Sequence, residues 1–470
     1  MTYTTPTYTD LYQLAMAQVY WQEGRAEEPA IFDYFYRKVP FSGGYTLAVG
    51  LEELQAILED WCFEERELRY LEQQGFPADF LRYLEKQRFR GTLRSVREGE
   101  VVFPLEPVLQ VEASLLQAQL VETVLLNTLN FQSLLATKAS RMRQVAGSAL
   151  LADFGLRRAQ GLGGYQASRA ALAGGFDSTS NVRAGMDFEL PIAGTMAHSL
   201  VQAYDNELEA FRAFARRRPE DCVLLVDTYD TLRSGLPHAI TVAWEMAERG
   251  EQLRGIRLDS GDLAYLARKC RRRLDAEGLD YVKIAASNQL DEYVIRSLRE
   301  QSAPIDLYGV GTSLVTGAPD GALDGVYKLA QVRDTPRIKL SESSSKTTFP
   351  GPKQVYRLKD AQGHWIGADV VACREEDPDS IQEMIDPQDP QRRMSLRGLQ
   401  LVPLLEPLRE EGRSTQARGG FQAVRDYSRR QLQRLDPEYR RFDNPHIYKV
   451  GLSPQLQELR EKLVRLHKPE

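Results

Sequence analysis

Arg257 and Asp259 stand two residues apart in the segment IRLDSGD, and their types suit an anionic sugar. A carboxylate followed by Ser-Gly can accept hydrogen bonds from both hydroxyls of a vicinal diol such as ribose. An arginine two residues earlier on a strand shares its face, and the guanidinium can form a bidentate pair with an oxyanion or carboxylate. We therefore interpret this pair as functional, whereas Asp262 in the same segment is equally well explained as a helix N-cap.

His198 is the second candidate, and it is one of only five histidines in the chain. It stands where an apolar segment, followed by Gly194 and Thr195, changes into a helical pattern, with Ser199 beside it. Small residues and hydroxyls at a helix start suit an anion. A neutral imidazole there could act as a base, a metal ligand or an acceptor of a phosphoryl group. On this segment alone, a capping turn with a packed histidine is the simpler interpretation.

Two further clusters contain residues suited to a phosphorylated ligand with a flat ring. Gly311 and Thr312, in GVGTS, would offer backbone N–H groups and a hydroxyl to a sugar phosphate. Phe154 could stack on a flat ring while Arg157 binds a carboxylate attached to it. A buried phenylalanine beside surface arginines explains the second cluster nearly as well.

Three residues have several chemical interpretations. Either Asp227 or Asp230 could hold the ring N–H of His198 and raise its basicity, or these two residues could bind magnesium or cap a helix. Lys283 could form a Schiff base, as in aldolases, although an outward-pointing lysine is the simpler interpretation.

These polar residues follow short apolar runs that recur through the middle of the chain. The runs are residues 149–152, 192–193, 223–226, 256–258, 282–286 and 307–310. The polar ends of the later runs are spaced by roughly thirty residues, the length of a strand, a helix and two loops. Such units predict a parallel sheet, and several in a row favour an α/β barrel with ligands at the carboxyl ends of its strands.

The length of 470 residues predicts two or three domains. Residues 1–114 show a mixed α+β pattern, beginning with a helix from the Thr9-Asp10 cap to about Gly24. Residues 115–335 hold the barrel pattern and the candidate site. Residues 336–470 read as strands and charged helices that pack on the rest.

Charge and cysteine content exclude several classes of protein. The net charge of −6 argues against a nucleic-acid coat, but it allows a local basic pocket. The four cysteines are far apart and form no CxxC pair, so zinc and a disulfide framework are not expected. No segment resembles a signal peptide or reaches membrane-spanning length. We therefore expect a cytoplasmic protein with no nucleic-acid or membrane partner.

Six motifs, in order, resemble the nicotinate phosphoribosyltransferase family, which belongs to the type II phosphoribosyltransferases. They are TDLYQLAMAQ (Thr9–Gln18), DFGLRRAQG (Asp153–Gly161), GGFDSTSN (Gly174–Asn181), AGTMAHS (Ala193–Ser199), RLDSGD (Arg257–Asp262) and GVGTS (Gly309–Ser313). The resemblance implies an irregular α/β barrel packed beside an α/β sandwich domain. It also implies a homodimer whose active sites are shared across the interface.

The resemblance implies a reaction of NAD biosynthesis, driven by ATP and classed with the ligases. Nicotinate and phosphoribosyl pyrophosphate give nicotinate mononucleotide and pyrophosphate, while ATP and water give ADP and phosphate, with Mg²⁺ as cofactor. His198 matches the histidine that ATP phosphorylates transiently, and Asp227 matches its partner more loosely. The positions matching substrate-binding residues are Tyr12 (from the partner subunit), Phe154, Arg157, Thr195, Ser199, Arg257, Asp259, Gly311 and Thr312. No metal ligand is assigned.

Other functions remain open from the sequence. The same transferase could prefer nicotinamide or quinolinate, because the region around Phe176–Thr179, where nicotinamide-using relatives carry an aspartate, aligns poorly. An aldolase using Lys283 is a second alternative. A catalytically silent nucleotide-sensing protein on the same fold is a third.

Overall fold

The computed structural model describes residues 4–340, 347–415 and 420–467, and it divides the chain into two compact units. Met1–Leu134 and Ala322–Glu470 together form what we call the discontinuous unit, and Leu135–Gly321 form the inserted unit. The expected ranges 1–114 and 336–470 thus fall within one unit.

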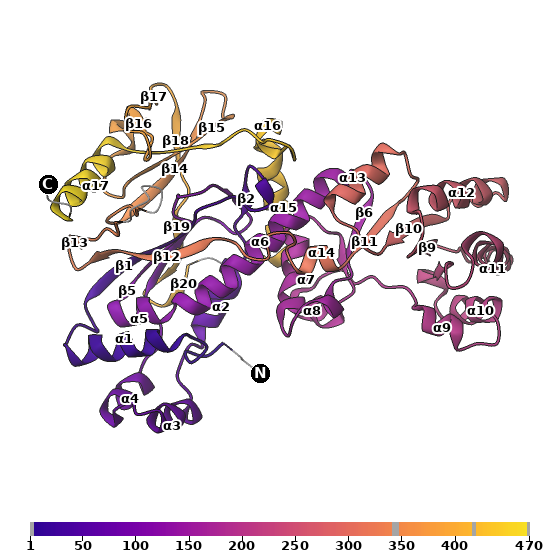
Figure 1. Cartoon of the computed structure of the whole chain (residues 1–470), viewed down its shortest axis with the longest axis horizontal. Helices are drawn as coiled ribbons and strands as arrows, with labels where there is room; N and C mark the ends of the chain where they lie inside the picture. The colour runs from indigo at the N-terminus through magenta and orange to yellow at the C-terminus, as the bar shows by residue number, and fades with distance from the viewer. Residues whose placement is uncertain (1–3, 341–346, 416–419, 468–470) are drawn as a thin grey trace. The chain divides into compact units, whose positions relative to one another are not determined.

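The discontinuous unit is built from the two ends of the chain (Figure 1). Its elements up to the inserted unit are α1 (Leu11–Gln22), β1 (Pro29–Tyr36), β2 (Thr46–Leu47), α2 (Leu51–Glu59), α3 (Glu65–Gln73), α4 (Ala78–Glu85), β3 (Thr92–Ser95), β4 (Val101–Val102), β5 (Leu109–Ser114), α5 (Leu115–Leu120) and the first half of α6 (Glu122–Ala146). Those after it are β12 (Gly325–Val332), β13 (Thr335–Pro336), β14 (Lys353–Lys359), β15 (Trp365–Cys373), β16 (Glu383–Ile385), β17 (Arg393–Ser395), β18 (Gln400–Pro403), β19 (Glu406–Glu410), β20 (Arg413–Ser414), α15 (Gly420–Arg434), α16 (Pro437–Arg440), β21 (Lys449–Leu452) and α17 (Pro454–His467). The predicted first helix is confirmed by α1, whose N-cap is Asp10.

Two larger sheets organise this unit. The first has the order β13-β12-β1-β5-β3-β19-β20, and every pair of neighbouring strands in it is antiparallel. The second has the order β17-β16-β21-β15-β14-β18. One apolar core takes side chains from both sheets, such as Phe32 of β1 and Val371 of β15. Burying such apolar surface is the main favourable term in folding.

A charged cluster lies buried beside that core. The Arg357 guanidinium pairs with Glu100 at 2.6 Å and with Asp369 at 2.9 Å, and the hydroxyl of Tyr448 donates to Asp369 at 2.8 Å. Burial, and next to it the Asp369 carboxylate, raise the pKa of Glu106 well above its ordinary value. Burial beside another carboxylate thus favours the neutral form of Glu106, whose Oε1 accepts a hydrogen bond from the Phe103 backbone N–H at 2.8 Å.

The inserted unit is built around a parallel sheet with the order β7-β6-β11-β10-β9-β8 (Figure 1). Its strands are β6 (Leu150–Asp153), β7 (Ser178–Thr179), β8 (Val223–Leu225), β9 (Gly255–Leu258), β10 (Lys283–Ser287) and β11 (Leu307–Val310). Its helices, besides the second half of α6, are α7 (Gly163–Ala173), α8 (Val182–Phe188), α9 (His198–Gln202), α10 (Glu207–Arg217), the π-helix Thr231–Gly235, α11 (Leu236–Glu248), α12 (Leu263–Ala276), α13 (Glu292–Glu300) and α14 (Thr312–Val315).

The α/β class is confirmed, and five of the six predicted apolar runs form strands of this sheet. The run at residues 192–193 forms only an isolated bridge, between Thr179 and Ile192. Among the described residues, the hydrogen-bonded strands make an open sheet with β7 and β8 at its edges. Because its strands are parallel, their carboxyl ends meet at one edge, where Phe154, Asp259 and Gly311 directly follow β6, β9 and β11.

No helix in the described part of the chain is both long enough and apolar enough to cross a lipid bilayer.

Candidate active site

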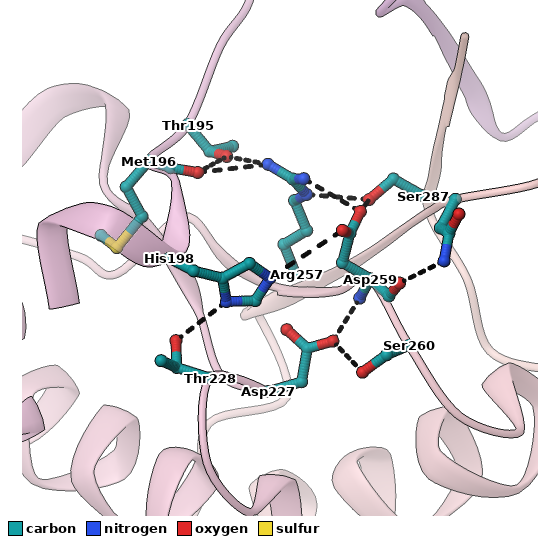
Figure 2. A network of polar contacts seen from close by, with 10 residues as sticks. Thr195, Met196, His198, Asp227, Thr228, Arg257, Asp259, Ser260 and Ser287 are labelled. Carbon is teal, nitrogen blue, oxygen red and sulfur yellow. Dashed lines mark hydrogen bonds and ion pairs between the residues drawn. The ribbon is translucent and has the colours of Figure 1, made fainter. Parts of the chain in front are cut away.

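Arg257, on β9, is the centre of a polar network at that edge (Figure 2). Its Nε donates to the Ser287 hydroxyl at 2.8 Å, its Nη1 to the Thr195 hydroxyl at 2.8 Å, and its Nη2 to Asp259 Oδ1 at 3.0 Å. Nη1 also donates to the carbonyl oxygen of Met196 at 3.3 Å. A guanidinium has five N–H groups, so one N–H on Nη2 has no partner among the described residues. The network thus fixes the arginine and leaves it a donor for a ligand.

Asp259, just beyond the end of β9, is held in its charged form. Its Oδ1 accepts hydrogen bonds from the Ser287 hydroxyl and from Arg257. Partial burial opposes ionisation, but these hydrogen bonds and the charge of Arg257 outweigh it and hold the pKa of Asp259 below its ordinary value. A carboxylate fixed in this way can accept hydrogen bonds from sugar hydroxyls or face a developing positive charge.

His198 is the first residue of α9, and its ring lies between two polar groups (Figure 2). Nδ1 lies 3.1 Å from the Thr228 hydroxyl oxygen, and Nε2 lies 3.9 Å from Asp259 Oδ2. The side chain is 40% exposed, so the ring is accessible to a ligand. The structure therefore places the predicted histidine within reach of the Arg257–Asp259 pair.

The expected contact between Asp227 and His198 is not formed. Asp227 Oδ2 instead accepts hydrogen bonds from the backbone N–H of Asp259 at 2.8 Å and from the Ser260 hydroxyl at 2.6 Å. These bonds tie the end of β8 to the loop after β9, so the carboxylate is turned toward the backbone. Its Oδ1 is buried and has no hydrogen-bond partner in the described part of the chain.

Phe154 and Gly309 lie against each other where β6 and β11 end. The backbone N–H of Phe154 donates to the carbonyl of Val310 at 2.8 Å, and its ring centroid lies 5.6 Å from the guanidinium carbon of Arg257. A Cβ on Gly309 would lie 2.3 Å from the ring, closer than real contacts allow. Glycine is therefore required there if the ring is to stay beside Arg257.

Asp153 anchors the loop that presents Phe154. Its buried carboxylate accepts hydrogen bonds from the Gly155 backbone N–H and from the hydroxyls of Ser168 and Thr179, each at 2.8 Å. Burial raises the pKa of Asp153, although these three donors oppose the shift. No pattern in the sequence predicts this role for Asp153.

The other predicted residues lie around this group or outside it. Gly311 is the N-cap of α14, and Thr312 is the first residue of that helix. A Cβ added at Gly311 would lie 3.2 Å from the Phe154 carbonyl oxygen. Ser199 is the exposed second residue of α9. Arg157 is exposed, and no hydrogen bond or ion pair joins it to the Arg257 network within the described residues. Tyr12 belongs to α1 of the discontinuous unit.

Ser287 and Thr228 were missed as site residues. Ser287 links Arg257 to Asp259, and Thr228 contacts His198. Both stand at the polar ends of predicted strands, so counting every hydroxyl at those ends would have found them.

The aldolase interpretation is wrong on geometry. Lys283 is the first residue of β10, at the opposite end of that strand from Ser287. Its side chain is 66% exposed and pairs with Asp306 at 3.3 Å. It lies outside the network and cannot act as its nucleophile.

The acidic residues of the network fit a metal that arrives with a phosphorylated ligand. No group of three or more His, Cys, Asp or Glu side chains able to hold a metal occurs among the described residues. Asp259 and the unpartnered Oδ1 of Asp227 nevertheless offer two carboxylates. Mg²⁺ is commonly held by one or two carboxylates together with substrate phosphates.

Family models and relatives match nearly the whole chain. The N-terminal domain of nicotinate phosphoribosyltransferase (NAPRTase) matches residues 7–130, the NAPRTase family model matches residues 149–364, and its C-terminal domain matches residues 352–460. The nicotinate phosphoribosyltransferase of Bacillus subtilis is 42% identical, over 98% of this chain and 95% of that protein. The Dictyostelium discoideum protein of the same name is 37% identical, over 97% and 87%. The crystal structure of human nicotinic acid phosphoribosyltransferase superposes with a TM-score of 0.87 at 32% identity, over 97% of this chain and 99% of that one.

Proposed function

The chain belongs to the nicotinate phosphoribosyltransferase family, and we propose that it joins nicotinate to phosphoribosyl pyrophosphate in NAD biosynthesis. The products are nicotinate mononucleotide and pyrophosphate. The observation that carries this proposal is the Arg257 network. It combines a fixed guanidinium, an ionised Asp259 and the Phe154 ring in one place.

The network suits both halves of the nucleotide. The free N–H of Arg257 is a donor for the carboxylate of nicotinate, and Phe154 offers a face for its ring. The hydroxyl of Thr195 accepts from Arg257 and donates to the Met196 carbonyl at 3.3 Å, so it holds that arginine in place. Asp259 is an acceptor for the ribose hydroxyls. The backbone N–H groups and hydroxyl at Gly311 and Thr312 are donors for the 5-phosphate.

The reaction needs positioning and charge more than a strong base. The ring nitrogen of nicotinate attacks the anomeric carbon of the ribose, the new C–N bond forms, and the bond to pyrophosphate breaks. Positive charge develops on the ribose as the bond to pyrophosphate weakens, and the Asp259 carboxylate is placed to stabilise it. Mg²⁺, when bound by Asp227, Asp259 and the substrate phosphates, supplies positive charge that stabilises the leaving pyrophosphate.

His198 supplies the link to ATP in this proposal. A ring nitrogen accepts the terminal phosphoryl group of ATP, ADP leaves, and hydrolysis of the phosphohistidine later gives phosphate. Its partly exposed ring, 3.9 Å from Asp259, supports this role because the phosphoryl group would face the ribose site.

We also propose that two copies pair so that Tyr12 of one closes on the nicotinate ring bound by the other. Tyr12 is 51% exposed, and its α1 neighbours Leu11 and Val19 are exposed as well. An apolar helix face left in solvent is typical of a contact with another chain. In this proposal the parallel sheet forms part of an irregular barrel, and the sheets of the discontinuous unit form the sandwich.

The test is product formation with three pyridines. Purified protein is incubated with phosphoribosyl pyrophosphate, ATP and either nicotinate, nicotinamide or quinolinate, and mononucleotide and pyrophosphate are quantified by chromatography. We expect product with nicotinate and an increase in rate with ATP. Product only with another pyridine would reassign the substrate, and no pyrophosphate with any of them would favour the nucleotide-sensing alternative.

A further inference from the structure

The discontinuous unit contains a cavity of about 690 Å³. Every residue that lines it belongs to that unit, so it shares no residue with the Arg257 network. Residues of β16, β17 and β21 line it, and β16 and β21 pair only between Ile385 and Leu452. The preceding residues Lys449–Gly451 pair with β15 on one side and line the cavity.

The walls of this cavity are largely apolar. Met384 and Met394, paired across β16 and β17, line it, as do the stacked rings of Phe103 and Tyr448. Ile447 also lines it and is 83% exposed, which is unusual for so apolar a side chain. Unbranched methionines adapt to the shape of a bound group. The volume lies within the range of about 300–1,000 Å³ found for small-molecule sites.

The rim of the cavity is positively charged. Lys449 has no ion-pair partner within the described residues. Arg392 and Arg393 each make one solvent-exposed pair, with Asp389 at 3.1 Å and with Glu383 at 2.7 Å. Exposed pairs of this kind are worth little, so both guanidiniums can turn toward an anion at small cost.

The one acidic side chain that lines the cavity is already engaged. Asp386 Oδ1 accepts hydrogen bonds from the backbone N–H groups of Gln388 at 2.8 Å and Asp389 at 3.2 Å. It therefore acts as a turn cap. The cavity combines an apolar slot with a cationic rim, although the chain as a whole has a net charge of −6.

We propose that this cavity is a second small-molecule site, which binds an anion carrying one or two flat rings. The apolar slot takes the rings, and Lys449 and the two arginines take the carboxylate, sulfonate or phosphate. Aromatic acids and nucleoside monophosphates share this chemistry. The site goes beyond the proposed reaction and does not depend on it.

The test uses the fluorescent aromatic sulfonate 8-anilinonaphthalene-1-sulfonate as the probe, with the full chain. We expect saturable binding of one probe per chain. Lys449→Glu should weaken it about tenfold or more, because a cation near the sulfonate becomes an anion. Lys462→Glu makes the same charge change on an exposed residue of α17 outside the cavity, and it should bind the probe like the unmodified chain. Nicotinate turnover should be unchanged in both variants. Lys449 and Lys462 are both exposed, so neither substitution should prevent folding.

Competition identifies the source of the anion. Displacement by benzoate would indicate an aromatic acid, displacement by adenosine monophosphate would indicate a nucleotide, and either supports the proposal. The proposal would be overturned if inorganic sulfate displaced the probe as effectively as benzoate and adenosine monophosphate do. It would also be overturned if the Lys449→Glu and Lys462→Glu variants bound the probe equally well. A drop in molecular mass for Ile447→Asp in sedimentation velocity would also overturn it, because a second copy of the chain would then be the occupant.

Discussion

The hydroxyl oxygen of Thr228 lies 3.1 Å from Nδ1 of His198, where a carboxylate was expected. A hydroxyl can donate or accept, so it can hold the ring without fixing a charge beside it. Asp227, the expected partner, is committed to the backbone after β9. The orientation of the proposed phosphoryl acceptor thus depends on an uncharged neighbour.

Replacing His198 by alanine should abolish the stimulation by ATP and leave slow, ATP-independent formation of mononucleotide. The ring nitrogen of nicotinate is itself the nucleophile, so the histidine is needed only for coupling. The measurement is initial rate with and without ATP. His364→Ala, at an exposed position of the other unit, should keep the stimulation. Undiminished stimulation in the His198 variant would exclude the phosphohistidine.

Thr228→Val should lower the ATP-stimulated rate about tenfold, because the Thr228 contact orients His198 and the loss of such a partner costs a metal-bound histidine about 10- to 100-fold. The rate without ATP should change little. Thr228→Ser restores a hydroxyl and should restore coupling, measured as ADP formed per mononucleotide. Equal rates in the valine and serine variants would show that the contact does not matter.

Ser287→Ala should shift the acid limb of the pH–rate profile to higher pH. The hydroxyl helps to keep the pKa of Asp259 below its ordinary value, and without it that pKa rises toward the ordinary value. Protonation of Asp259 on acidification then begins at a higher pH. The KM for nicotinate should also rise, since Arg257 loses a partner. Ser297→Ala, at an exposed site on α13, is the control and should leave the profile unmoved.

Gly309→Ala should raise the KM for nicotinate strongly, because the added Cβ would lie 2.3 Å from the Phe154 ring and must displace it. Gly194→Ala is the matched control, since a Cβ there meets nothing within 4 Å. Steady-state kinetics on both variants, with circular dichroism to check folding, measures the effect. Similar KM values in the two variants would show that the position of the Phe154 ring is unimportant.

Glu106→Gln should remove a loss of stability at high pH. Because the folded-state pKa of Glu106 is raised, the folded protein retains a proton that the unfolded chain releases above its ordinary pKa of 4.5. The stability from this group is present below that pH and is lost as pH rises toward the folded pKa. Thermal unfolding from pH 5 to pH 9 should show that the melting temperature of the variant rises relative to that of the unmodified chain as the pH rises. The control is Glu410→Gln, on the exposed end of β19, whose melting temperature should change with pH as that of the unmodified chain does.

The sequence predicts the inserted unit better than the discontinuous one. Strands buried on both faces of a parallel sheet leave contiguous apolar runs, which is why β8 to β11 were found. The pairing of β3 with β19 joins residues about three hundred positions apart and leaves no local signal. The run at residues 192–193 is apolar but makes a single bridge, so its apolar composition alone wrongly predicted a strand there.

The same contrast holds at the site. Residue types and spacing indicated Arg257 and Asp259 because both act from the end of one strand. The predicted contact between Asp227 and His198 was wrong because the direction of a side chain at a strand end depends on neighbouring loops. Ser287 was not singled out because the hydroxyls at the strand ends were not counted as candidates, and its bridge between Arg257 and Asp259 becomes visible only once β9 and β10 are paired.

The interleaved ends of the chain impose an order on its synthesis. A ribosome finishes residues 135–321 while the strands that complete the outer sheets, including β12 and β19, are still unmade. Local contacts can form the inserted unit at that stage, whereas the N-terminal strands must wait with unpaired edges exposed. A nascent chain stalled shortly after residue 321 would therefore carry a formed parallel sheet together with an incomplete discontinuous unit, whose unpaired strand edges invite aggregation.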